Sequence, residues 1–408
     1  MSLYATIAWR NLWRNRRRSL IAMSSVVFAV VIALATRSMQ LGSYAHTIHN
    51  VVSFYTGYLQ VHERGFQDSQ SLESSFTRPD SVAVTVNAVR HVTLCAPRLE
   101  SFALLSSGNV TDGAQLIGID PEREDRLTEL ARKVASGRYL RADDQGILLG
   151  SELARHLGLA VGDTVVALGS GYHAASAVGR FRIVGTVRFP TPDLNATIAY
   201  LALPAAQVFY DAPDRVTSLA VMIDDPHALP GVESRLAARL GRTFEVVSWE
   251  TMMPEMVQYI RLDNASGVIM LMLVYVVIGF GILGTVLMMT LERTREFGVL
   301  IAVGMQRRLL GGIVLCESLM LALLGALAGI LLGIPLIAYM AAHPILLSGS
   351  AARAMEGYGF EPILPFSLAP SIFLWQTIAV LALAVAAAAL PLHRVTTLDP
   401  VAAMREGH

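Results

Sequence analysis

Charged residues are scarce in this chain of 408 residues: 16% are Asp, Glu, Lys or Arg, whereas 53% are hydrophobic. Soluble globular domains carry about a quarter charged residues, so this balance indicates a membrane protein. The formal net charge is zero and the sequence has no long basic tract. We therefore expect no nucleic-acid partner.

Lysine and cysteine are almost absent. Lys133 is the one lysine, and Arg132 precedes it. A phosphate-binding GxxxxGK[ST] loop needs Gly directly before Lys, so the chain has no P-loop of its own. The two cysteines, Cys95 and Cys316, lie in segments of different character, which argues against a disulfide framework.

Familiar catalytic motifs are missing as well. The sequence has no GxSxG elbow, no HExxH and no CxxC pair. Gly279, Gly281 and Gly284 match GxGxxG, but they lie inside a hydrophobic run, where close helix packing explains them better than a dinucleotide site. We therefore expect a non-catalytic chain that binds no cofactor itself.

Two histidines raise the question of a metal site. His46 and His49 are three residues apart and can share a helix face, but no third ligand is evident nearby in the sequence. Solvated histidines, and no metal, are the favoured interpretation.

Four stretches are long and apolar enough to cross a bilayer. They run from 19 to 36, from about 265 to 291, from 309 to about 342 with Glu317 as the one charge and an expected bend at Pro335, and from about 366 to 392. The first also resembles a secretory signal, since arginines precede it and Ala33–Ala35 resembles a cleavage site. Signal cores are about 7 to 15 residues, so the longer run favours a retained helix.

Arginine sets the expected orientation. It is concentrated before the first run, between the second and third runs, and in the C-terminal tail, whereas the loop after the third run holds only Arg353 among cations. By the positive-inside rule both termini are cytoplasmic. The region from about 37 to 264 then lies outside the cytoplasm and is long enough for one or two domains.

This outer region has mixed patterns. GYLQVHE, TVVAL and FRIVGTVRF alternate like strands, SELARHLGLAVGD has helical spacing that ends in Gly, and PGVESRLAARLGRTFEVVSW predicts a helix, a glycine stop and a strand. The sequence therefore predicts a membrane α-helical protein with four transmembrane helices and a large α+β extracytoplasmic domain between the first two. The expected segments are a cytoplasmic juxtamembrane helix (1–18), transmembrane helix 1 (19–40), the outer core domain (41–263), transmembrane helix 2 (264–291), a short cytoplasmic helix (292–308), transmembrane helix 3 (309–342), an outer loop (343–365), transmembrane helix 4 (366–392) and a cytoplasmic tail (393–408).

The N-terminal segment AWRNLWRNRRR can form an amphipathic helix at the membrane surface. Its indoles, Trp9 and Trp13, would lie at the headgroup level, with Arg14 and Arg17 facing the cytoplasm and anionic lipid. These four residues are the expected interfacial anchors.

A glycine ladder marks the third hydrophobic run. Gly325, Gly329 and Gly333 recur at four-residue steps and allow another helix to approach closely. That helix can belong to the same chain or to a second copy. In the same run Glu317 is costly unless it is paired, protonated or in a wet interior, and pairing or packing is favoured over a proton relay.

The stretch LERTREFGVLIAVGMQRR, residues 291–308, is too short to span a bilayer and too apolar for a solvated loop. As a helix it places Phe297, Leu300 and Ile301 on one face, with Glu292, Arg295 and Glu296 on adjacent turns. An apolar helix face is stable only when it is buried. Physical reasoning alone leaves two possibilities, burial in the membrane interface and docking in a partner's groove.

Several stretches together resemble the FtsX-like permease family of ABC transporters. They are RNLWRNRRRSLI, ERTREFGVLIAVGMQRR, the glycine ladder and the ending LDPVAAMREG. GILLGSELARHLGLAVGDTVVAL and GRFRIVGTVRF resemble that family's periplasmic core domain, as in MacB and the lipoprotein-releasing permeases LolC and LolE. TGYLQVHERGF is most similar to the LolC/LolE branch.

The resemblance implies a permease subunit of the bacterial inner membrane whose separate cytoplasmic ATPase dimer binds ATP and Mg. Further implied partners are a second permease subunit, identical or different, membrane lipids and a periplasmic cargo or adaptor. The stretch after the second helix would be the coupling helix. Its ATPase contact would comprise Glu292, Arg293, Arg295, Glu296, Phe297, Gly298, Val299, Leu300, Ile301 and Gly304.

In this family ATP hydrolysis moves the outer domains, so the resemblance implies mechanotransmission for lipoprotein release or for lipid or peptide export. The lipoprotein-releasing permeases also carry a proline-rich hook, for which residues 189–192 (FPTP) are the candidate. The alternative is an FtsX-like scaffold that regulates a cell-envelope hydrolase. A proton-coupled transporter centred on Glu317 is a third hypothesis, against which the lack of an internal repeat argues.

Overall fold

The computed structural model describes residues 3–14, 16–52, 56–189, 192–357 and 361–397. The ending LDPVAAMREG and part of the proposed hook segment lie outside the described residues. The chain divides into two compact units. The helical unit comprises residues 1–45, 259–346 and 363–408, and the sheet unit comprises residues 46–258 and 347–362.

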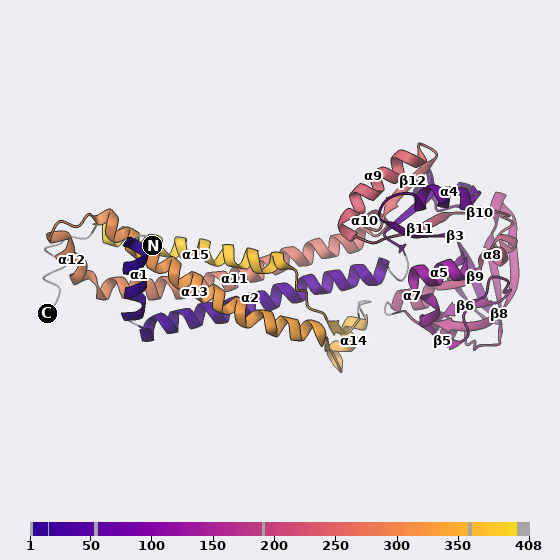
Figure 1. Ribbon diagram of the computed structural model, residues 1–408. Helices are drawn as coiled ribbons and strands as arrows, with labels where there is room; N and C mark the ends of the chain where they lie inside the picture. The colour runs from indigo at the N-terminus through magenta and orange to yellow at the C-terminus, as the bar shows by residue number, and fades with distance from the viewer. Residues whose placement is uncertain (1–2, 15, 53–55, 190–191, 358–360, 398–408) are drawn as a thin grey trace. The chain divides into compact units, whose positions relative to one another are not determined.

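Four helices are long and apolar enough to cross a membrane: α2 (Arg16–Val51), α11 (Pro254–Glu292), α13 (Arg307–Ala342) and α15 (Pro370–Thr397). Two short helices complete the end of the helical unit that carries the N-terminus, α1 (Leu3–Arg14) and α12 (Thr294–Ala302). Figure 1 shows the long helices running side by side. Pro335 lies within α13, which continues beyond it to Ala342.

Two of the long helices extend past their expected ends at residues 40 and 264. The extensions are bonded to each other within the helical unit, where Tyr44 donates to the Asp263 carboxylate at 2.6 Å. Just inside the expected ends, Arg37 donates to the Asn264 side-chain oxygen at 2.8 Å. These bonds satisfy the hydrogen-bonding needs of polar residues within the two helices. A search for apolar runs stops at such residues and therefore predicts helices that are too short.

The glycine ladder of α13 packs against α2 of the same chain. A Cβ built on Gly325 would lie 2.8 Å from the Val26 side chain, and one built on Gly329 would lie 2.8 Å from that of Val30. Both valines are buried. The structure thus contains packing of the glycine ladder within one chain. Packing against a second copy stays a prediction.

The sheet unit is built on a ten-stranded mixed sheet with the order β12-β1-β11-β3-β4-β9-β6-β8-β5, and β7 pairs with β3 and β8. Its strands are β1 (Leu59–Glu63), β3 (Val92–Ser107), β4 (Val110–Ile119), β5 (Val134–Gly137), β6 (Ile147–Gly150), β7 (Thr164–Ser170), β8 (Ser176–Val187), β9 (Ile198–Ala202), β11 (Ser218–Ile223) and β12 (Phe244–Ser248). The main helices are α4 (Pro79–Asn87), α5 (Pro121–Thr128), α6 (Ser151–His156), α8 (Leu203–Phe209), α9 (Leu229–Leu240) and α10 (Trp249–Met252).

The mixed α and β content predicted for this region is confirmed. The alternating segments form β1, β7 and β8, and SELARH forms α6. Gly241 ends α9 with a φ of 72°, a conformation that suits glycine, and β12 follows. One apolar core lies under β3, β4 and β6 to β9, and a second lies under β1 and β11 with α4 and α9.

The prediction of a solvated His46 is wrong. Its Nε2 lies 2.5 Å from the Glu361 carboxylate, and Asn50 donates to the same oxygen at 3.2 Å. The hydrogen bond from His46 lowers the pKa of Glu361, against the opposing effect of burial. Glu361 is 315 residues away along the chain, so local spacing gave no sign of it.

Replacing Gly329 with Leu should destabilise the helical unit, because the new side chain must displace Val30. Overpacking of this kind costs about 1–3 kcal/mol, seen as a lower midpoint of thermal unfolding in detergent. Gly281→Leu on α11 is the matched control, since nothing lies within 4 Å of its Cβ position. Equal midpoints for the two variants would contradict the packing of α13 on α2.

Candidate functional site

α12 is a short helix held between two long ones. It begins after Arg293, where the Phe297 amide donates to the Arg293 carbonyl at 2.9 Å. It ends before Gly304, whose φ of 105° is strained for any residue with a Cβ. The Gly304 amide bonds back to Ile301 at 3.0 Å and closes the end of the helix.

The apolar residues of α12 divide into two faces, in place of the single face expected from the sequence. Phe297 is 2% exposed and packs in the core of the helical unit, with Ile301 against it. Gly298 is buried as well. The outward apolar face consists of Val299, Leu300 and Val303, which are 46%, 37% and 83% exposed.

A buried ion pair anchors α12 to α13. Nη1 of Arg293 lies 3.1 Å from the Glu317 carboxylate, and their side chains are 12% and 9% exposed. The guanidinium also stands over the Phe297 ring, 5.2 Å from its centroid. With the Asn11 amide oxygen turned toward Arg293, that oxygen accepts from both terminal nitrogens at 3.2 and 3.0 Å. Glu317 is therefore paired, as the sequence favoured.

α1 and the start of α2 add exposed contacts to the same end of the unit. Arg14 of α1 binds Glu296 at 3.0 Å, and Arg18 of α2 forms an ion pair with Glu292. Burial raises the pKa of Glu296, but hydrogen bonds from Arg293 and Arg14 outweigh it, and the net pKa is lowered. Because these side chains are half exposed, each such pair contributes only about 0–1 kcal/mol.

Only some of the residues expected at the ATPase contact are exposed and unpaired among the described residues. Arg293, Phe297 and Gly298 face the interior. Glu296 is paired with Arg14 of α1, and Glu292 is paired with Arg18 of α2. Arg295 is exposed, and the described residues offer it no ion pair. It stands with Val299, Leu300, Val303 and Gly304 on the outward side.

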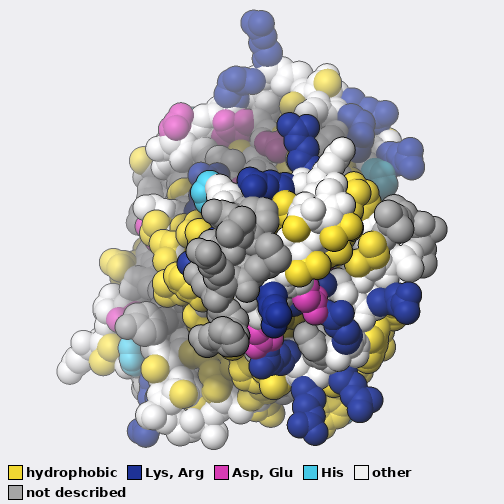
Figure 2. Space-filling model, turned by 90° about the vertical axis from the view of Figure 1, so that its left-hand side faces the viewer, with side chains coloured by type: hydrophobic (Ala, Val, Ile, Leu, Met, Phe, Trp, Pro, Cys, Tyr) yellow, Lys and Arg dark blue, Asp and Glu magenta, His cyan; other side chains and the backbone are white. Residues whose placement is uncertain are grey.

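The surface at this end combines cationic and apolar side chains. Figure 2 shows arginine side chains spread over it, with hydrophobic side chains between them. Trp9 and Trp13 of α1 are 40% and 48% exposed, and their rings meet edge to face at 5.7 Å. Arg17 is also exposed. Anchoring by these residues in lipid stays a prediction.

Two known protein families match this chain. Residues 19–239 match the MacB-like periplasmic core domain, and residues 268–400 match the FtsX-like permease C-terminal family. The chain belongs to the FtsX-like, MacB-type family of ABC transporter permeases.

Its relatives share modest identity. The lipoprotein-releasing system transmembrane protein LolC of Neisseria meningitidis is 25% identical over 59% of this chain and 60% of that protein. LolE of Haemophilus influenzae is 24% identical over 75% of each. The macrolide export ATP-binding/permease protein MacB of Aggregatibacter actinomycetemcomitans is 23% identical over 81% of this chain and 51% of that protein. The match to LolC thus spans less than two thirds of that relative's length.

Among solved structures, the periplasmic region of MacB from Actinobacillus actinomycetemcomitans matches at 20% identity. It covers 52% of this chain and 97% of that chain, with a TM-score of 0.35.

Replacing Arg293 with Ala should destabilise the permease strongly, because Glu317 would be left buried and unpaired. Breaking a buried pair costs about 3–5 kcal/mol. Thermal unfolding in detergent measures it, and adding Glu317→Leu to Arg293→Ala should restore much of the loss. Arg14→Ala is the control, expected to cost less than about 1 kcal/mol because its pair is exposed. Equal losses for the two arginines would contradict the anchoring role of Arg293.

Proposed function

We propose that this permease couples ATP hydrolysis by a separate cytoplasmic ATPase to movement of its MacB-like domain. The ATP and its Mg would be bound by the ATPase. The observation that carries the proposal is the outward face of α12, Val299, Leu300 and Val303, which is apolar and exposed on a helix that is itself fixed in place. An exposed apolar face on a rigid helix suits docking in a partner's groove.

The contacts that anchor α12 explain how a movement of the ATPase against that face would be transmitted to the long helices. Arg293 and Phe297 tie the helix to α13 and to the core of the helical unit, so α12 cannot yield as a free loop. From Glu292 the chain continues in α11, one uninterrupted helix of 39 residues. At 1.5 Å per residue this rod is about 58 Å long and ends in the segment that follows β12.

Orientation and assembly belong to the same proposal. α12 and both termini would face the cytoplasm of a cell with an inner membrane, where the arginines of α1 and α12 meet the positive-inside rule. An ATPase dimer would act on two permease subunits, identical or different. All four long helices carry exposed hydrophobic side chains, which are available for contact with lipid and with a second permease.

Lipoproteins are the favoured cargo, because relatives with matches to 59–75% of this chain are named for a lipoprotein-releasing system. Export of a lipid or peptide is the other transport pathway, since MacB and a probable syringafactin exporter, SyfD, also match. The scaffold alternative would need a hydrolase or its adaptor on the MacB-like domain and no transported cargo.

The test is affinity purification of the full chain from native membranes in mild detergent, with mass spectrometry of the co-purifying proteins. We expect a P-loop ATPase in stoichiometric amount. Val303→Asp should lower its recovery at least tenfold, because a carboxylate in an apolar groove is strongly disfavoured.

Val208→Asp in the sheet unit is the matched control, since Val208 is 82% exposed and Val303 is 83% exposed. Loss of the ATPase from the Val303 variant alone supports the proposed contact. Recovery of the ATPase with both variants would place the contact elsewhere. No ATPase with the unmodified chain would favour the scaffold.

A further inference from the structure

A cavity of about 230 Å³ with polar and apolar lining residues lies in the sheet unit, and it shares no lining residue with α12 or its ion pairs. Gln60 and His62 reach it from β1, Glu100 from β3 and Gln115 from β4. Alternation along β1 explains this placement, because Leu59 and Val61 are fully buried in the apolar core on the other face.

His62, which lines this cavity, has an unsatisfied acceptor. Its Nδ1 lies 2.9 Å from the Thr217 carbonyl oxygen, which can only accept, so Nδ1 carries the proton. Burial lowers the pKa of His62, and the neutral ring then presents Nε2 as an acceptor. Nε2 is buried, and the described residues supply it no hydrogen-bond partner. A buried polar atom left so costs about 1–3 kcal/mol. Nε2 has almost no accessible surface, so a donor in the cavity would recover this cost only if the ring turned toward it.

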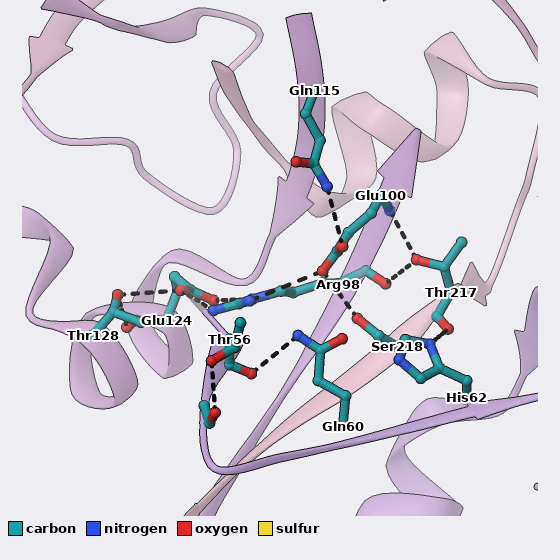
Figure 3. Close-up of polar contacts among 11 residues, drawn as sticks. Thr56, Gln60, His62, Arg98, Glu100, Gln115, Glu124, Thr128, Thr217 and Ser218 are labelled. Atoms are coloured by element: carbon teal, nitrogen blue, oxygen red, sulfur yellow. Dashed lines mark hydrogen bonds and ion pairs between the residues drawn. The ribbon is translucent and has the colours of Figure 1, made fainter. Parts of the chain in front are cut away.

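Glu100 adds a carboxylate to the same wall. Ser218 donates to one of its oxygens at 3.1 Å and Gln115 to the other at 3.5 Å. Arg98 is bound bidentately by Glu124 at 2.9 and 2.7 Å but lies 3.9 Å from Glu100. Figure 3 shows Arg98 extended between the two carboxylates. The guanidinium is thus mainly committed to Glu124, and burial raises the pKa of Glu100 despite Arg98.

A third acceptor is a carboxamide oxygen. Gln60 donates through Nε2 to the Thr56 carbonyl at 3.0 Å, which leaves Oε1 as its acceptor (Figure 3). The remaining wall is apolar and includes Phe66, which stacks on His62 at 4.6 Å, together with Phe102, Met252 and Met253.

We propose that this cavity binds the protonated amine of a lysine side chain, presented by a polypeptide partner or cargo. An ammonium group has three donors and no acceptor, which complements His62, Glu100 and Gln60. The methylene stem would lie along the phenylalanines and methionines, as such stems do on apolar surfaces. A phospholipid headgroup fits less well, because its phosphate needs a cation and the described lining includes neither Lys nor Arg.

The size of the cavity agrees with a single side chain. Drug-sized ligands occupy pockets of roughly 300–1,000 Å³, larger than this one. Neighbouring carboxamides, among them those of Gln67 and Gln70, are suited to bond the backbone that carries the lysine. The binding test needs neither the ATPase nor ATP. Its result is therefore independent of whether the proposed contact between α12 and an ATPase is correct.

The experiment uses the full chain in lipid nanodiscs with ¹³C-methyl-labelled methionine. Of the 16 methionines, Met252 and Met253 line the cavity, so their resonances report binding there. The probe is Nα-acetyl-lysine methylamide. We expect a saturable shift confined to these two methyls, and at least tenfold weaker binding of the Nε-trimethyl form, which keeps the charge but has no N–H donors.

Glu100→Gln should weaken binding of the probe at least tenfold, whereas Glu122→Gln, at an exposed position on α5, should leave it unchanged. Equal binding of the trimethyl form, or no effect of Glu100→Gln, would overturn the proposal. Tighter binding of glycerophosphoethanolamine than of the lysine probe would reassign the site to a lipid headgroup. No saturable shift with any probe would mean a water-filled cavity only and would also overturn it.

Discussion

The ion pair between Arg293 and Glu317 determines how the end of this permease that carries α12 is built. A carboxylate at Glu317, well inside a hydrophobic helix, is tolerable only with a partner. Its partner comes from the residue that directly precedes α12, so satisfying Glu317 also fixes where α12 lies. The segment between the second and third long helices is therefore a rigid part of the helical unit.

α13 holds this arrangement together. On one turn it binds Arg293 through Glu317, and about two and three turns further on it packs against α2 at Gly325 and Gly329. Small residues allow that close approach where lipid provides no hydrophobic drive for helix association. Contacts at α12 and at α2 thus meet on one helix, and α11 continues from Glu292 without interruption. This continuity is the physical basis for the proposed transmission of movement.

Much of this fold could be predicted from local pattern, since apolar runs identified the long helices and alternation identified β1, β7 and β8. What local pattern missed depends on contacts between distant segments. Arg14 and Glu296 are 282 residues apart, and Tyr44 and Asp263 are 219 apart. Neither pair has a periodic signal, yet one joins α1 to α12 and the other joins the extensions of α2 and α11.

Phe297 illustrates the limit for the candidate site. A helical wheel places it beside Leu300 and Ile301, but only tertiary packing decides that Phe297 turns inward while Leu300 stays exposed. The cavity of the sheet unit was likewise beyond reach, because its walls come from β1, β3 and β4 and the segment after α10. The stretch TGYLQVHERGF around His62 predicted a strand and a family branch but no binding role. The hydrogen bond that fixes the His62 proton on Nδ1 is accepted by Thr217, 155 residues away.

Contact between the outward face of α12 and an ATPase can be tested in living cells. The photo-crosslinking residue p-benzoylphenylalanine is placed at Val303 of the full chain, and the crosslinked product is identified by mass spectrometry. We predict a crosslink to a protein that carries a GxxxxGK[ST] loop. Crosslinks to lipid alone, or only to proteins without such a loop, would contradict the proposed contact.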